Sequence, residues 1–213
     1  MKWQVKYALE NLSRDQDVAS AAHVGGDAIQ IAVHGHPDVL AIISDAHIID
    51  RELIREYFLE FPVMDFMCGY RKECIWEGGA IRFLKEKNIG WGSAGTLSSA
   101  LGKDDIRTAT HKEYRFAYRL IEQSRSISDL NREYDRIFSL KLWNGKPLRV
   151  GMVREYEPTA DAIRTLWERF GPVDIVWSIN PNGFPRADAI EAGRELGCDV
   201  LQWDELKSVL KGR

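Results

Sequence analysis

The chain has 213 residues, a length that fits one large domain or two small ones. With 45% hydrophobic and 29% charged residues, its composition excludes a disordered chain, a collagen-like repeat and a disulfide scaffold. The formal net charge of −3 provides no general basic field, so any contact with nucleic acid must come from a local patch. Three cysteines indicate reduced thiols and a cytoplasmic protein. The first residues resemble neither a signal peptide nor a transmembrane span, so we expect no membrane association.

The sequence repeats itself at a constant offset, which aligns residues 39–101 with 148–210 without a gap. The predicted elements of the two segments coincide as well, so we expect two related units at 1–101 and 102–213. Identical residues occupy the aligned positions Ile54/Ile163, Arg55/Arg164, Phe61/Phe170, Asp65/Asp174, Ala80/Ala189, Ile81/Ile190, Glu86/Glu195, Leu97/Leu206, Ser99/Ser208 and Leu101/Leu210.

Apolar spacing and turn residues predict the same elements in both units. In the first unit we expect a helix at 5–12, strands at 27–33 and 39–44, a helix capped by Asp50, a strand at 63–68, a helix at 79–87, a strand at 89–91 and a helical turn at 96–101. In the second we expect a helix at 110–125, strands at 137–143 and 148–153, a helix capped by Thr159, a strand at 173–179, a helix from Pro185 to Gly197 and a strand at 200–203. Strands that alternate with helices favour parallel pairing, so each unit is predicted to be an α/β mixed sheet flanked by helices.

This element order resembles the restriction endonuclease-like (PD-(D/E)xK) superfamily, in particular its Mrr-type branch. The similarity lies in GGDAIQI at 25–31 and in the closing segment 173–206, VDIVWSINPNGFPRADAIEAGRELGCDVLQWDEL. The resemblance implies two tandem restriction-endonuclease-like units. It also implies that Asp27 is the first metal-binding carboxylate of one unit and that Asp135 takes the equivalent place in the other.

A nuclease of this family needs an Asp on one strand and an acid-x-Lys pattern on the next. The carboxylates hold Mg²⁺, and the Lys positions the attacking water. The next strands read VLAIISDAH and LRVGMVREYE, and neither contains acid-x-Lys. If a unit is active with Mg²⁺ or Mn²⁺, the candidate metal ligands are Asp27 and Asp45. The full set of candidate catalytic residues is Asp27, Asp45, His47, Asp135 and Glu155.

Basic residues at two kinds of position are candidates for contacts with nucleic-acid phosphates, and we expect DNA rather than RNA. One group lies on a single face of the helix at 110–125, and the other follows predicted strands, where open α/β sheets bind ligands. The candidates are Lys112, Arg115, Arg119, Arg71, Lys72 and Arg154.

Three functions stay open from the sequence. The first is a nucleic-acid-associated protein with a duplicated, catalytically degenerate endonuclease-like fold that binds or scaffolds. The second is an active divalent-metal-dependent nuclease. The third is a structural pseudo-domain for protein interaction, and a homo-oligomer or a protein partner also stays open. Two minor alternatives are a metal site at His34 and His36 and a metallophosphoesterase-like pair, Asp45 and His47.

Overall fold

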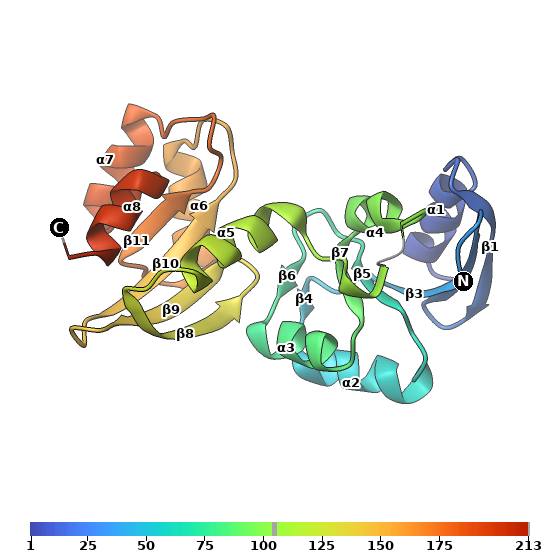
Figure 1. Ribbon diagram of the computed structural model, residues 1–213. Coiled ribbons are helices and arrows are strands. Elements are labelled where there is room, and N and C mark those ends of the chain that lie inside the picture. Colours follow the sequence, from blue (N-terminus) through green and yellow to red (C-terminus); the bar gives the residue numbers. More distant parts are fainter. Residues whose placement is uncertain (104–105, 213) are drawn as a thin grey trace. The chain divides into compact units, whose positions relative to one another are not determined.

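The computed structural model describes residues 1–103 and 106–212 and divides the chain into two compact units (Figure 1). Unit 1 is Met1–Lys112 and unit 2 is Glu113–Arg213. The segment after residue 101 belongs to unit 1, because the Trp91 amide donates to the Ala109 carbonyl at 2.9 Å. The boundary therefore lies beyond the expected end of the first unit at residue 101.

The two units contain similar series of elements. The first series is α1 (Trp3–Leu12), β1 (Val18–Gly25), β2 (Ala28–Val33), β3 (Val39–Ser44), β4 (Ile48–Ile49), α2 (Arg51–Glu60), β5 (Phe66–Gly69), β6 (Ile75–Trp76), α3 (Gly78–Glu86), β7 (Gly90–Ser93), α4 (Ala94–Ala100) and the 3-10 helix η1 (Ile106–Thr108). The second is α5 (Lys112–Glu122), β8 (Ile127–Tyr134), β9 (Ile137–Leu142), β10 (Pro147–Val153), α6 (Ala160–Phe170), β11 (Ile175–Ser178), α7 (Ala187–Leu196), β12 (Asp199–Leu201) and α8 (Trp203–Leu210).

The offset that relates Ile54 to Ile163 extends through the whole fold. Apart from β4, β6 and η1, every element of unit 1 recurs in unit 2 at this offset, and the bounds of matched elements agree to within a single residue. The repeat therefore reaches back from the aligned segment 39–101 to the start of α1. A gapless offset across loops as well as elements means that any residue of one unit can be compared directly with its counterpart.

Among the described residues, each unit has a five-stranded sheet of the same order, β1-β2-β3-β5-β7 in unit 1 and β8-β9-β10-β11-β12 in unit 2. The first three strands of each sheet are antiparallel neighbours, and the last three are parallel. The parallel strands need crossovers, which α2 and α3 supply in unit 1 and α6 and α7 in unit 2.

Helices cover both faces of each sheet (Figure 1). In unit 1, one buried cluster joins α1 and α4 to the sheet, through Val5 and Leu97, and a second joins α2 and α3, through Ile54 and Leu84. In unit 2, α5 and α8 share one buried cluster with the sheet, while α6 and α7 contact one another and strands β10 and β12. Each unit therefore has an α/β/α arrangement with core on both sides of the sheet.

Two of the identical pairs of the repeat, Ile54/Ile163 and Asp65/Asp174, have the same structural role in both units. Ile54 and Ile163 are fully buried at the same position on α2 and α6. The Asp65 carboxylate accepts from the Leu40 amide at 2.8 Å, and the Asp174 carboxylate accepts from the Arg149 amide at 2.7 Å. Each aspartate thus ties the start of its strand β5 or β11 to the neighbouring strand. A carboxylate that satisfies a backbone amide at the end of the sheet explains why this polar residue recurs.

Several local predictions are confirmed and others are wrong. Asp50 caps α2 by accepting from the Leu53 amide at 2.8 Å, and Gly197 ends α7 in the left-handed region. Pro185 does not start α7, which begins at Ala187 after an extended Arg186. The edge strands β1 and β8 were not predicted.

No helix in the described part of the chain is long and apolar enough to span a membrane.

Candidate functional site

The first candidate site lies at the edge of the unit 1 sheet where the parallel strands end. Strand β2 runs antiparallel to β3, so its start lies beside the end of β3, and the Ile43 amide donates to the Asp27 carbonyl at 2.8 Å. Gly26 precedes Asp27 with φ +48, a left-handed conformation that glycine adopts without strain. This tight turn places Asp27 at the same edge as Ser44 and Asp45.

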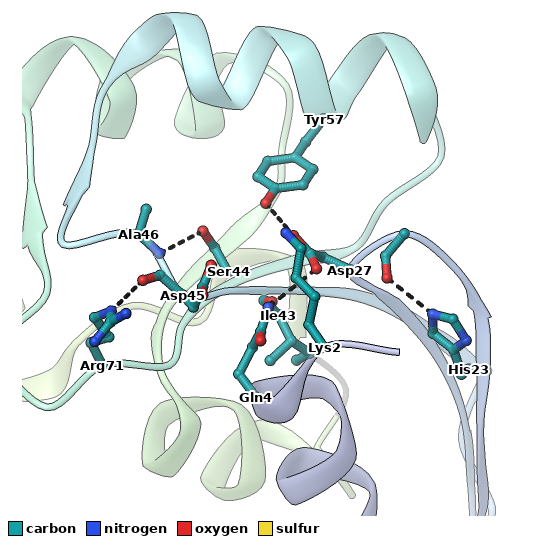
Figure 2. A network of polar contacts seen from close by, with 11 residues as sticks. Lys2, Gln4, His23, Asp27, Ile43, Ser44, Asp45, Ala46, Tyr57 and Arg71 are labelled. Carbon is teal, nitrogen blue, oxygen red and sulfur yellow. Dashed lines mark hydrogen bonds and ion pairs between the residues drawn. The ribbon is translucent and has the colours of Figure 1, made fainter.

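Three side chains hold the Asp27 carboxylate, which is only 3% exposed (Figure 2). Lys2 Nζ lies 2.8 Å from Oδ2, and the Tyr57 hydroxyl donates to the same oxygen at 2.6 Å. Gln4 Nε2 donates to Oδ1 at 3.1 Å. Figure 2 shows Tyr57 reaching Asp27 from helix α2, while Gln4 and Lys2 reach it from helix α1 and the residues before it. Both carboxylate oxygens are therefore engaged by the protein.

The network raises the pKa values of two of its members, Lys2 and Tyr57. The hydrogen bond to Asp27 raises the pKa of Lys2, an effect that burial partly opposes. Burial and the hydrogen bond to Asp27 raise the pKa of Tyr57 well above its ordinary value. At neutral pH the arrangement is a Lys2–Asp27 ion pair with a neutral phenol as a further donor.

The other predicted residues of unit 1 lie around this network but are engaged differently. The Asp45 carbonyl accepts from Arg71 Nε, and the Arg71 guanidinium also lies 5.9 Å from the Trp3 ring centroid. Asp45 contributes to the raised pKa values of both Lys2 and Tyr57, which places it in the same neighbourhood. His47 and Lys72 have exposed side chains, and the His47 carbonyl accepts from the Ile75 amide.

The residues at this edge do not fit the divalent metal that the resemblance implies. A metal on Asp27 would have to displace Lys2, Tyr57 or Gln4 from its oxygens. Within residues 1–103 and 106–212, no three His, Cys, Asp or Glu side chains are grouped so as to hold a metal ion. The same finding leaves His34 and His36, and the pair Asp45 and His47, without support as metal sites.

In unit 2, the counterpart of Asp27 is an arginine. The Met152 amide donates to the Arg136 carbonyl at 2.9 Å, as the Ile43 amide does to the Asp27 carbonyl. The strand register agrees, because Ile137 pairs with Gly151 as Ala28 pairs with Ile42. Asp135, which we expected at this place, lies one residue earlier, at the position of Gly26. The expectation came from chemical likeness, whereas the register follows the constant offset of the repeat.

Asp135 is instead the partner of Arg136. Its carboxylate, 2% exposed, accepts from Arg136 Nη2 at 2.9 Å and from Nε at 3.1 Å. The Arg136 guanidinium also lies 5.4 Å from the ring centroid of Tyr114 and 5.7 Å from that of Phe170. The bidentate pair and the two aromatic rings together fix the direction of the guanidinium, and an arginine carries its positive charge throughout the physiological pH range.

A second arginine supports the same turn. Arg132 donates through Nη2 to the Asp135 carbonyl at 2.6 Å and through Nε to the Tyr134 carbonyl at 3.2 Å. Burial lowers the pKa of Arg132 to about 10, so the guanidinium is charged at neutral pH. Its counterpart His23 contacts the Gly26 carbonyl in unit 1 at 3.0 Å. The two turns are thus braced alike by different side chains.

The remaining predicted residues of unit 2 are exposed. Arg154 and Glu155 follow strand β10 directly, at the positions that Asp45 and Ala46 hold after β3. Arg115 and Arg119 are exposed on α5, as is Lys112 at its start. The structure therefore places Arg136 and Arg154 on one sheet edge and the α5 cations on the helix that covers one face of that sheet.

Sequence reasoning missed four of the residues that define the two edges. Lys2, Gln4 and Tyr57 carry no motif, because their roles depend on a contact with Asp27 that only the fold creates. Arg136 had a signal, since the constant offset of the repeat, continued toward the start of the chain, pairs it with Asp27.

Comparisons of this chain with protein-family profiles, with curated proteins and with solved structures give no match.

Proposed function

We propose that this protein is nucleic-acid associated and that its duplicated endonuclease-like fold binds phosphates without cleaving them. The element order of each unit, a helix, antiparallel strands and then alternating helices and strands, is the order on which the resemblance to the PD-(D/E)xK superfamily rests. The proposal assigns DNA binding to unit 2 and a structural role to the Asp27 network of unit 1.

The observation that carries the proposal is a change from aspartate to arginine at two equivalent positions of the fold. Where unit 1 has Asp27 and Asp45, unit 2 has Arg136 and Arg154. In a metal-dependent nuclease, the carboxylates recruit a cation that then meets the phosphate. Guanidinium groups carry positive charge themselves and bind phosphate oxygens in a planar, bidentate manner. Arg136 is already paired with Asp135, so exposed Arg154 is the guanidinium at this edge that we assign to a phosphate. Because strand β10 and the residues directly after it contain no acid-x-Lys pattern, the edge suits binding better than hydrolysis.

Exposed cations nearby extend this edge. Arg115 and Arg119 lie on α5, which packs on the same sheet through Tyr114 and Ala117. Arginine on a helix face can position a duplex through its phosphates without reading its bases. The positive charge of these arginines is confined to a local surface, because Asp and Glu elsewhere give the whole chain a net charge of −3.

The test is a titration of fluorescent duplex and single-stranded DNA with the full chain at salt concentrations from about 25 to 200 mM. We expect the affinity to fall with salt, because neutralised phosphates release counterions. In Arg115→Gln, Arg119→Gln and Arg154→Gln, the magnitude of the slope of log affinity against log salt should fall by about 1 for each phosphate that the variant no longer neutralises. Arg194→Gln is the matched control, since Arg194 is exposed on α7 and pairs only locally with Glu191 at 3.0 Å.

Two results would overturn the proposal. If neither DNA nor RNA binds at low salt, the nucleic-acid role fails and the protein-interaction alternative gains support. If Mg²⁺ or Mn²⁺ produces cleavage that Asp27→Asn or Asp135→Asn abolishes, the protein is an active nuclease and the fold is not degenerate.

A further inference from the structure

Unit 2 contains a cavity of about 360 Å³ that the proposed phosphate contacts do not use. It opens between α5, the carboxyl end of β11 and the start of α8. A hollow at the carboxyl ends of parallel strands is a usual place for a ligand in an open α/β sheet. Its aromatic and polar walls include Phe116, Trp177, Ile179, Asn180, Trp203 and Asp204.

Aromatic rings form much of the wall. Trp177 and Trp203 lie with ring centroids 5.1 Å apart and planes inclined by 32°, and Phe116 on α5 is 57% exposed. Trp177 is buried within the core cluster, whereas Trp203 is only partly buried at the start of α8. Partly exposed aromatic side chains favour a planar aromatic ligand, because such a ligand can stack on them face to face.

Two buried polar atoms of residues in this wall, Trp177 Nε1 and Ser178 Oγ, lack a hydrogen-bond partner among the described residues. Trp177 is 2% exposed, and in the described part of the chain its indole Nε1 has no hydrogen-bond acceptor. A buried donor without an acceptor is costly and rare in folded proteins. Asn180 and Asp204 add polar groups at the same cavity, and Asn180 Oδ1 already accepts from the Asn182 amide, which leaves its amide N–H groups as donors.

A smaller cavity overlaps the corresponding place in unit 1. There the cavity measures about 60 Å³ and is lined by Asn11 and Tyr70, the counterparts of Leu120 and Ile179. Tyr70 accepts from Asn11 Nδ2 at 3.1 Å, and its ring meets Trp3 edge-on at 5.9 Å. The cavity at Leu120 and Ile179 in unit 2 is therefore larger than the one that Asn11 and Tyr70 line in unit 1.

We infer that this cavity receives a single unstacked nucleobase, with its face against Trp203 and Phe116 and a ring nitrogen or carbonyl accepting from Trp177 Nε1. A base offers both π faces for stacking and an edge with donors and acceptors, which suits the amide of Asn180 and the carboxylate of Asp204. The inference rests on the proposed function, since exposed Arg154 at the same sheet edge would hold the adjoining backbone.

The experiment uses free, uncharged nucleosides, so that base binding is separated from phosphate binding. We expect adenosine, guanosine, cytidine or thymidine to quench the tryptophan fluorescence of the full chain at millimolar concentrations, with little dependence on salt. Phe116→Ala and Trp203→Ala should each weaken binding at least fivefold, and Trp203→Phe should restore part of it. Trp143→Ala is the matched control, because Trp143 is 74% exposed and outside the cavity.

A filling variant tests the cavity without removing a core ring. Ile179→Tyr reproduces the side chain of Tyr70 in unit 1, and we expect it to abolish nucleoside binding while salt-dependent DNA binding persists. If DNA binds but no nucleoside does, the cavity assignment fails and the proposed function stands. If nucleosides bind but DNA does not, the cavity holds a small heteroaromatic ligand and the proposed function fails. Binding of choline in place of nucleosides would overturn the assignment in favour of an organic cation.

Discussion

The two units share a fold and differ at the sheet edge that holds Asp27 in unit 1 and Arg136 in unit 2. The constant offset of the repeat holds through helices, strands and loops, yet Asp27 and Asp45 in unit 1 correspond to Arg136 and Arg154 in unit 2. Residues that stay the same include buried ones such as Ile54 and Ile163. Other buried positions differ between the units, as Cys68 and Trp177 do, so the shared fold tolerates changes in the core as well as at the sheet edge.

The difference at the edge changes the neighbours too. Tyr57 donates to Asp27 in unit 1, and its counterpart in unit 2 is Leu166, which packs against Gly151. In unit 2 no carboxylate stands at the position of Asp27, so a tyrosine hydroxyl would have no acceptor there, and the apolar Leu166 occupies the position of Tyr57. Residues that contact one another at the edge therefore differ together between the units. We expect substitutions at the edge to reduce stability more than substitutions of the shared aspartates.

The largest expected effect is in Asp27→Ala. The substitution removes an acceptor shared by Lys2, Gln4 and Tyr57, of which Gln4 is fully buried, so unit 1 should lose about 3 kcal/mol of stability. Native-state hydrogen exchange in the full chain measures this, because amides of β2 and β3 report unit 1 and amides of β9 and β10 report unit 2. Unchanged exchange in β2 would contradict a structural role for the network.

A smaller and similar effect is expected at the shared aspartates. Asp65→Ala and Asp174→Ala each remove a carboxylate that accepts from an amide of a neighbouring strand, at 2.8 and 2.7 Å. Each should cost its own unit about 2 kcal/mol, since the amide loses a charged partner. The measurement is again hydrogen exchange, in β3 for one variant and in β10 for the other. Costs that differ several-fold would show that the two scaffolds are not energetically alike.

The sequence predicted the shared scaffold better than the edge. Apolar spacing identified the helices and the parallel strands, because both depend on burial patterns that recur along the chain. The edge strand β1 was missed, since its side chains are mostly exposed or half-buried and its alternation is weak. Asp27 was found from its Gly-Gly turn, but its partners Lys2 and Tyr57 come from distant segments and have no local signature.

Alkaline pH should destabilise unit 1 selectively. The folded state raises the pKa of Tyr57 through burial and the Asp27 hydrogen bond, and it raises the pKa of Lys2 as well. Above about pH 10 the unfolded chain releases protons that the folded chain retains, so stability falls by up to about 1.4 kcal/mol per pH unit for Tyr57 and by much less for the largely exposed Lys2. Tyr57→Phe should flatten this loss. An equally steep alkaline loss in the variant would assign it to other groups.

Acid pH should act on unit 2 through the pair of Glu133 and Arg149. The hydrogen bond from Arg149 lowers the pKa of Glu133, and Arg149 Nη2 lies 2.7 Å from its carboxylate. A lowered pKa means that the contribution is present above the unfolded value of about 4.5 and is lost as the pH falls through the folded value. Because both side chains are partly exposed, we expect a loss of about 1 kcal/mol. Hydrogen exchange in β8 and β10 between pH 6 and pH 3.5 measures it, and Glu133→Gln should remove most of the difference.

The counterparts of this pair in unit 1 are Val24 and Leu40, so the same acid step should leave β1 and β3 unaffected by this mechanism. An acid loss of equal size in β1 and β3 would show that the general titration of carboxylates, and not this ion pair, sets the acid stability of both units.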